Sequence, residues 1–256
     1  MEVQVVDAFT DRAFAGNPAG VVLLTAPADE AWMQAVAAEM KHAETAFVEL
    51  RDDDEPLGLR WFTPVREVDL CGHATLAAAH VLGGDRRFRT RSGVLTCAAR
   101  DGWVEMDFPA DPAEPAEVTA ELRAGLPGVT VEAVGRAVSD VLVQVASAAQ
   151  VRALEPDLAA LAAVPGRGVI VTAPGDRPGL DVVSRCFYPS YGVPEDPVTG
   201  SAHCTLASWW APRLGKPELF AEQCSPRGGQ VRATLVGDRV RLAGRAVTVL
   251  RGRLIV

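Results

Sequence analysis

Three side chains stand where they could carry protons. Glu44 lies between a predicted helix and the apolar segment 45–50, and a carboxyl that loses water there holds its proton more tightly and can exchange it near neutral pH. His73 and Asp196 each stand close to the start of a predicted helix. Taken alone, each has a common structural explanation: a surface carboxylate, a satisfied histidine or a helix cap. Glu44, His73 and Asp196 are therefore candidate proton carriers.

Two glycine-led helix starts accompany these residues. They are Cys71-Gly72-His73-Ala74 and Thr199-Gly200-Ser201-Ala202. Exposed amides at a helix N-terminus bind anions, and glycine lets a ligand come close to the backbone. Either glycine alone could serve only the turn into a packed helix. As a pair, Gly72 and Gly200 predict a cradle for a carboxylate.

The sequence lacks the motifs of several other enzyme classes. The motifs of phosphate-binding loops, dinucleotide-binding folds, zinc proteases and serine hydrolases are absent. Asp196, Ser201 and His203 suit a catalytic triad poorly, because Ser201 and His203 are two residues apart and point in different directions. His73 and His80 are about two helical turns apart, too far to share one metal ion comfortably. We therefore expect no cofactor and no metal.

Short strands and a few helices must hold these residues in place. Apolar segments are separated by Gly, Pro and Asp turns, and the helices are marked by acidic starts and glycine ends. The predicted helices cover 29–40, 74–82, 117–124, 156–163 and 202–214, and the predicted strands include Val3, Val5 and 21–24 and then cover 45–50, 57–62, 94–99, 103–108, 129–136, 140–146, 168–173, 181–187, 229–236, 239–243 and 247–251.

The two halves of the chain resemble each other. Residues 60–64 and 185–189 share the pattern R-x-F-x-P. Further on, and at nearly the same offset, 67–74 and 195–202 each carry a Glu and then a Gly at the start of an Ala-rich helix. Two long matches in the same order predict a duplicated α+β unit, against the alternative of one continuous sheet with coincidental matches. A ligand site would then lie in the cleft between two domains.

A Pro-, Ala- and Glu-rich stretch predicts where the domains meet. The segment 109–128 has this composition, which is typical of a connection. We expect an N-terminal domain over 1–112, a linker over 113–128 and a C-terminal domain over 129–256. The last strand of the C-terminal domain could pack on the N-terminal one.

Charge and composition exclude several partners. The 256 residues carry a formal net charge of −8 and 48% of them are hydrophobic, which is typical of an acidic globular protein. Such a chain suits neither nucleic acid nor an anionic membrane, and no apolar run reaches the ~18 residues of a membrane span. The chain start lacks a basic signal-peptide region, and the five cysteines are odd in number and widely spaced. We therefore expect a cytoplasmic protein.

Several segments together form a recognisable pattern. They are 44–48 (ETAFV), 61–64 (WFTP), 67–75 (EVDLCGHAT) and 195–202 (EDPVTGSA), with 7–10, 16–21, 225–229 and 244–247 in agreement. This pattern resembles that of the phenazine-biosynthesis isomerase family, the PhzF-like proteins, nearly from end to end. The resemblance implies a diaminopimelate epimerase-like fold: two similar domains, each a strongly curved, barrel-like β-sheet around a central helix, related by a pseudo-twofold axis. It also implies a homodimer, a small carboxylate substrate and no cofactor.

The resemblance also implies a mechanism. The family's named member isomerises trans-2,3-dihydro-3-hydroxyanthranilate, and the residue that matches its acid/base glutamate is Glu44. One carboxyl would remove a proton from carbon and return it to another carbon on the same face, while helix-terminal amides stabilise the developing charge. The other matching groups are His73, Asp196 and Ser201, together with the amides at Gly72 and Gly200 that would hold the substrate carboxylate.

Two alternatives stay open. Related epimerases and racemases use two cysteines as acid and base. Here Cys71 stands at the first position, but Thr199 stands at the second and cannot act as a thiolate near neutral pH. An epimerase or racemase acting next to a carboxylate is therefore the second hypothesis, after a Glu44 isomerase. A non-catalytic binding or scaffold protein that kept the cleft is the third, and the joint presence of the site residues speaks against it.

Overall fold

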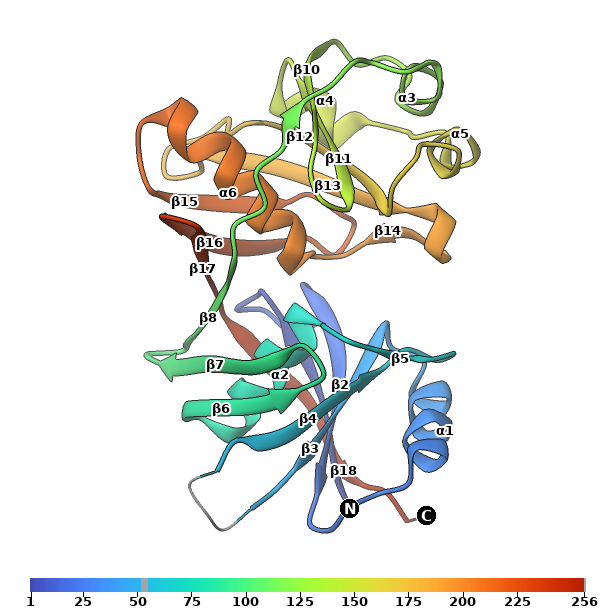
Figure 1. Ribbon diagram of the computed structural model, residues 1–256, viewed down its shortest axis with the longest axis vertical. Coiled ribbons are helices and arrows are strands. Elements are labelled where there is room, and N and C mark those ends of the chain that lie inside the picture. The colour runs from blue at the N-terminus through green and yellow to red at the C-terminus, as the bar shows by residue number, and fades with distance from the viewer. Residues whose placement is uncertain (52–54, 256) are drawn as a thin grey trace. The chain divides into compact units, whose positions relative to one another are not determined.

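The protein divides into two compact units. The computed structural model describes residues 1–51 and 55–255. The first unit consists of Met1–Asp107 and Ala243–Val256, and the second of Phe108–Leu242. The first unit is therefore built from two separate stretches of chain and the second from one. Each unit has a curved sheet with helices packed on it (Figure 1).

The elements follow one another closely along the chain. In the first unit they are β1 (Glu2–Ala8), β2 (Asn17–Leu24), α1 (Glu30–Met40), β3 (Glu44–Glu49), β4 (Leu57–Phe62), β5 (Glu67–Val68), α2 (Gly72–Leu82), β6 (Gly84–Thr90), β7 (Gly93–Arg100), β8 (Trp103–Pro109) and β18 (Ala246–Arg253). In the second they are β9 (Glu114–Pro115), α3 (Ala120–Gly125), β10 (Val131–Arg136), β11 (Asp140–Val145), α4 (Ala148–Ala153), α5 (Leu158–Ala162), β12 (Gly168–Pro174), β13 (Val182–Tyr188), η1 (Pro189–Tyr191), β14 (Val193–Asp196), α6 (Gly200–Leu214), β15 (Glu218–Gln223), β16 (Gly229–Val236) and β17 (Arg239–Gly244).

The sheet of the first unit curves around α2. β1 pairs antiparallel with both β2 and β18, β2 pairs parallel with β3, and β3 pairs antiparallel with β4. β4 pairs antiparallel with the short β5 and parallel with β6, and β6, β7 and β8 continue as an antiparallel series. α2 contacts six strands of this sheet: β18, β1, β2, β3, β6 and β7. It is therefore the central helix of the unit (Figure 1).

The composition of α2 explains its central place. The helix is rich in alanine, and the seven consecutive residues His73–Ala79 are all buried. Alanine has the highest helix propensity, and its short side chain lets strands approach on every side. A helix that is apolar all round is stable only when it is surrounded by protein, as α2 is.

The strand pairings of the first unit recur in the second. β10 pairs antiparallel with β11, β11 parallel with β12, and β12 antiparallel with β13. β13 pairs antiparallel with the short β14 and parallel with β15, and β15 pairs antiparallel with β16. This is the order of directions that leads from β1 to β7. The helix in the position of α2 is α6, which buries ten of its fifteen residues.

The repeated sequence pattern marks a repeated ion pair. Arg60 donates from Nε and Nη2 to Glu67 at 2.7 and 2.6 Å, and Arg185 donates from the same atoms to Glu195 at 2.7 and 2.8 Å. In each unit the guanidinium also lies 5.1 Å from the ring of the phenylalanine two residues later. These bidentate pairs fasten the short strand before each central helix, β5 or β14, to the neighbouring strand, β4 or β13. An internal duplication predicts this recurrence, and the duplication itself stays a prediction.

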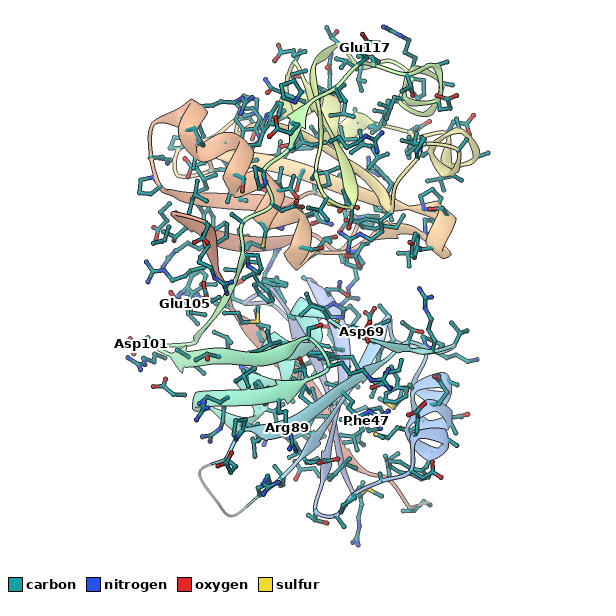
Figure 2. All side chains as sticks on the ribbon, in the orientation of Figure 1. Phe47, Asp69, Arg89, Asp101, Glu105 and Glu117 are labelled. Atoms are coloured by element: carbon teal, nitrogen blue, oxygen red, sulfur yellow. The ribbon has the colours of Figure 1, made fainter. Side chains whose placement is uncertain are left out.

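Each unit has its own apolar core. In the first, α1 covers the outer face of the sheet, where Met33 of α1 packs with Phe47 and Phe62. The two phenylalanine rings meet edge to face with centroids 5.5 Å apart, a favoured aromatic geometry. Figure 2 labels Phe47 among the side chains of this unit. The sheet is thus held between α1 outside and α2 inside, so strand ends such as that of β3 are fixed.

The expected α+β class is confirmed, while several details differ from the sequence-based expectations. Residues 113–128, expected as a linker with a helix over 117–124, carry β9 as well as α3 (Ala120–Gly125), and Leu122 is buried in the core of the second unit. β18 pairs with β1, as expected for the last strand, so the end of the chain lies with the first unit. The elements that escaped prediction are β5, β6, β9, α4, η1, β14 and β15. β6 (GDRRFRT) was missed because Phe88 is its only buried residue.

None of the helices in the described part of the chain has the length and hydropathy needed to cross a membrane.

Candidate active site

The two central helices begin without a side-chain cap. Cys71 is the N-cap of α2 and Thr199 that of α6, and neither makes a side-chain cap hydrogen bond. The first-turn amides from Gly72 and from Gly200 therefore keep capacity for another acceptor, which is how helix N-termini bind anions. The other α-helices of residues 1–51 and 55–255 do have a side-chain cap, from Asp29, Thr119, Ser147 and Asp157.

Glu44 opens β3. The strand pairs parallel with β2, with Glu44 opposite Ala19, and Thr45–Val48 are all buried. The backbone of Glu44 is thereby fixed by sheet pairing. Its side chain keeps 22% of its surface exposed, so the carboxylate is half withdrawn from water and yet within reach of a ligand.

His73 lies against Glu44. Its Nε2 atom is 3.5 Å from Glu44 Oε2, and its Nδ1 atom is 3.5 Å from Cys71 Sγ. Loss of water on burial, with a smaller contribution from the charge of His42, lowers the pKa of His73 to about 3. The imidazole is therefore neutral at physiological pH, and its contact with Glu44 is not a salt bridge.

Glu44, Cys71 and His73 form one group, the Glu44 cluster. One ligand atom from each residue lies within 4.8 Å of the other two. The sheet supplies Glu44, whereas the start of α2 supplies Cys71 and His73. The structure thus brings together two of the predicted catalytic residues with the cysteine of the alternative hypothesis, beside the predicted binding amide of Gly72.

Asp196 belongs to a tight network at the start of α6. Its Oδ2 atom accepts a hydrogen bond from Thr199 Oγ1 at 2.5 Å. Gln223, fully buried at the end of β15, accepts from the Thr199 amide at 2.9 Å and donates to the Asp196 carbonyl at 2.7 Å. The carboxylate is half-buried. The network fixes both the turn into α6 and the place of Asp196.

His203 has a structural setting. It is completely buried, its Nδ1 lies 2.7 Å from the Thr199 carbonyl, and burial lowers its pKa to about 4. Ser201 is exposed, and its hydroxyl accepts a hydrogen bond from Arg167. This geometry agrees with the exclusion of a triad that contains Ser201 and His203.

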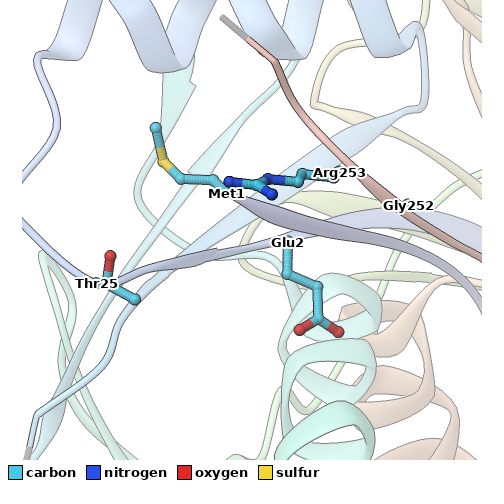
Figure 3. Close-up of a pocket in the computed structure, with 5 residues that line it drawn as sticks. All are labelled: Met1, Glu2, Thr25, Gly252 and Arg253. Atoms are coloured by element: carbon cyan, nitrogen blue, oxygen red, sulfur yellow. The ribbon is translucent and has the colours of Figure 1, made fainter.

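A pocket near the chain ends has a different character. It is lined by Met1, Glu2, Thr25, Gly252 and Arg253 (Figure 3). None of the predicted site residues lines it. The pocket therefore gives no support for a catalytic site at this edge of β1 and β18.

Comparison with known proteins gives the family. The family profile described as "Phenazine biosynthesis-like protein" matches residues 6–252. The chain belongs to this family. An uncharacterized isomerase of Halalkalibacterium halodurans is 46% identical over 262 residues, which cover 99% of this chain and 98% of the relative.

Solved structures agree with this assignment. The crystal structure of a PhzF-family phenazine biosynthesis protein from Enterococcus faecalis is 38% identical, with a TM-score of 0.94 over 100% of this chain and 99% of that one. A probable proline racemase from Agrobacterium radiobacter K84 shares the fold alone, at 12% identity and a TM-score of 0.61 over 99% and 92% of the two chains. The PhzF-like isomerase family expected from the sequence is confirmed, and the roles of individual site residues stay predictions.

Sequence reasoning missed two residues of this PhzF-like protein that hold the second unit's site residues. Gln223 carries the network around Asp196. Arg167 donates to Ser201 Oγ at 2.8 Å and forms a bidentate pair with the buried Asp140 at 2.9 and 2.5 Å. No motif marks either residue.

Proposed function

We propose that this protein is a cofactor-independent isomerase that moves a proton between two carbons of a small cyclic or amino-acid-like carboxylate, with Glu44 as the single acid and base. The observation that carries the proposal is the Glu44 carboxylate, half-buried at a fixed strand end and 3.5 Å from a buried imidazole. Family membership supports the reaction class.

The proposed reaction needs one group that acts first as a base and then as an acid. Glu44 takes a proton from one carbon of the substrate and becomes a carboxylic acid, and the electron pair left behind spreads into the adjoining π system. The acid then returns the same proton to a second carbon on the same face. His73 lies beside Glu44 as a neutral, buried neighbour, and the uncapped amides at Gly72 stabilise negative charge on the substrate carboxylate.

The second unit contributes its own predicted residues to this proposal. Asp196 would form hydrogen bonds to ring substituents, and Gly200 and Ser201 would bind the carboxylate. Because Arg167 can only donate, the Ser201 oxygen accepts from it, and the Ser201 hydrogen stays available for an anion. Kinetics of Asp196→Asn and Ser201→Ala variants test these roles, and a loss confined to one substrate group identifies the contact.

The first experiment is proton exchange at carbon. The full chain is incubated in D2O with a panel of small carboxylates that includes trans-2,3-dihydro-3-hydroxyanthranilate, and deuterium uptake is followed by NMR. Glu44→Gln should lower exchange at least about 100-fold, the scale of a positioned acid/base. Glu49→Gln, at the other end of the same strand, is the matched control and should keep full exchange. Exchange that survives in Glu44→Gln would refute the role of Glu44.

A second candidate function rests on Cys71. Its sulfur lies 3.5 Å from His73 Nδ1, and a neighbouring imidazole is the base that activates thiols in other enzymes. An epimerase or racemase would use this thiol at a carbon next to a carboxylate. Cys71→Ala separates the two functions, since it should leave a Glu44 isomerase active and abolish a thiol-dependent enzyme. If no carboxylate exchanges, a binding or scaffold protein becomes the better hypothesis.

The assembly and location expected from the sequence are part of the same proposal. A homodimer predicts twice the chain mass of 27.1 kDa in light scattering after gel filtration. A cytoplasmic protein predicts recovery with the soluble fraction of its native cells. A monomer in light scattering would contradict the homodimer, and recovery in another cell fraction would contradict the cytoplasmic location. Neither result would bear on the proposed reaction.

A further inference from the structure

The Glu44 cluster contains the donor types of a transition-metal site. It offers a carboxylate oxygen, a thiol sulfur and an imidazole nitrogen, all within 4.8 Å of one another. In tetrahedral zinc sites, Zn–N and Zn–O distances of about 2.0 Å and Zn–S distances of about 2.3 Å place neighbouring donors about 3.3–3.6 Å apart. The 3.5 Å contact with Glu44 is made by His73 Nε2, and the 3.5 Å contact with Cys71 is made by Nδ1 on the other side of the ring. An ion binds only one of these nitrogens. The donor that contacts the other nitrogen lies within 4.8 Å and must approach by about 1 Å to reach tetrahedral spacing, which a side-chain rotation allows.

A buried polar atom in the cluster points independently to a ligand. His73 is only 6% exposed, and its Nε2 atom has no hydrogen-bond partner among the described residues. This nitrogen faces Glu44 Oε2. A buried polar atom without a partner costs free energy, and an ion bound there removes that cost.

We propose that the Glu44 cluster binds one Zn²⁺ ion per chain through Glu44, Cys71 and His73, and that the bound ion inhibits the isomerase. On binding, the Cys71 thiol loses its proton to the buffer and the thiolate sulfur joins the ion, with no change of oxidation state. Water completes the fourth position, as in zinc sites with three protein ligands.

Inhibition follows from competition for the same lone pair. A Glu44 oxygen that ligates Zn²⁺ cannot take a proton from carbon. The claim of inhibition rests on the proposed function, whereas the claim of Zn²⁺ binding rests on the Glu44 cluster alone. An experiment can therefore refute either claim without refuting the other.

Cys224 provides a matched control thiol. It is half-buried, and Arg152 Nη1 lies 2.5 Å from its sulfur. A guanidinium at this distance repels a divalent cation, so Cys224 should not bind one. The Cys224 control also shows whether metal binding needs Cys71 in particular or only an accessible thiol.

Binding is measured with Co²⁺, a spectroscopic substitute for Zn²⁺. The full chain is reduced, freed of metal with a chelator and titrated, and Zn²⁺ is then used to displace the cobalt. The expected result is one Co²⁺ per chain with a thiolate-to-cobalt charge-transfer band. Cys71→Ser should remove the band, Glu44→Gln should weaken Zn²⁺ binding about tenfold or more, and Cys224→Ser should change neither. Circular dichroism checks that each variant is folded.

Several results would overturn the proposal. They are a band that persists in Cys71→Ser, a band lost in Cys224→Ser, unchanged Zn²⁺ affinity in Glu44→Gln, or no binding below about 1 mM. Deuterium exchange with and without Zn²⁺ then tests inhibition, and its midpoint should equal the Zn²⁺ dissociation constant. Exchange unaffected by saturating Zn²⁺, or dependent on it, refutes inhibition. Cobalt binding that needs Cys71, in a protein that exchanges no carboxylate, contradicts the proposed function and supports the metal site.

Discussion

Gln223 allows the support of the second unit's site residues to be tested by a single change. Its side chain is fully buried and makes three hydrogen bonds: it accepts from the Thr199 amide at 2.9 Å, and it donates to the Asp196 carbonyl at 2.7 Å and to Thr199 Oγ1 at 3.2 Å. Leucine has nearly the volume of glutamine. Gln223→Leu therefore removes these bonds while it opens little cavity.

The expected cost follows from the group that loses its partner. The Thr199 N–H lies on a buried residue and would lose its acceptor, at about 1–3 kcal/mol. Gln223→Leu should therefore lower the free energy of unfolding of the second unit by about 1–3 kcal/mol. Gln150→Leu is the control, since its side chain also accepts from a backbone amide, that of Thr130 at 3.1 Å, but at an exposed place. There water replaces the lost bond, and the change should stay below about 1 kcal/mol.

Urea unfolding followed by tryptophan fluorescence measures both variants, since Trp209 and Trp210 of α6 report on the second unit. Hydrogen exchange of the peptides over 197–206 gives a local reading, and Gln223→Leu should speed it. A Gln223→Leu protein within 1 kcal/mol of the parent, with unchanged exchange over 197–206, would refute the assignment of this network as the support of Asp196.

Three further predictions concern the first unit and pH. Gly244→Ala should cost about 1–3 kcal/mol and lower Tm in calorimetry, because its Cβ would lie 2.4 Å from Phe9 Cδ1 and 2.8 Å from Leu76 Cδ1; Gly252→Ala, with its nearest atoms at 3.7 Å, should change little. Burial lowers the pKa of His73 to about 3 and that of His203 to about 4, against about 6.5 in the unfolded chain. The unfolded chain thus binds more protons below pH 6.5. The free energy of unfolding should therefore fall from pH 6.5 toward pH 4 by up to about 1.4 kcal/mol per pH unit for each histidine. The substitution His203→Asn should make this pH dependence less steep, as measured by urea unfolding at several pH values. The imidazole nitrogens of both residues should stay uncharged at pH 5.5 in ¹⁵N NMR, and charged rings there would contradict their burial.

Local sequence signals predicted the central helices and their starts. α2 and α6 begin at Gly72 and Gly200, because a glycine followed by small residues marks the turn into a buried helix. The R-x-F-x-P pattern predicted equivalent places in the two units, and the Arg60 and Arg185 ion pairs occupy them. These features were predictable because their partners lie within about ten residues along the chain.

Contacts between distant residues could not be predicted in the same way. Gln223 meets Thr199 across 24 residues and Arg167 meets Ser201 across 34. Neither pair has a fixed spacing or composition that a motif could express, since tertiary packing alone places the partners. The same holds for Glu44 and His73, which the sheet and α2 bring within 3.5 Å. The sequence supplied the types of these side chains, and the fold supplied their grouping.

The split of the first unit sets an order of events during synthesis. β1 needs β18 as one of its two neighbours, and β18 is made after all of the second unit. A ribosome that has released residues 108–242 has released everything the second unit contains, so that unit can fold while translation continues. The first unit must wait with one edge of β1 unpaired. Such an edge can join a strand of another chain, so the nascent protein is most prone to mispairing in the interval before residues 246–253 emerge.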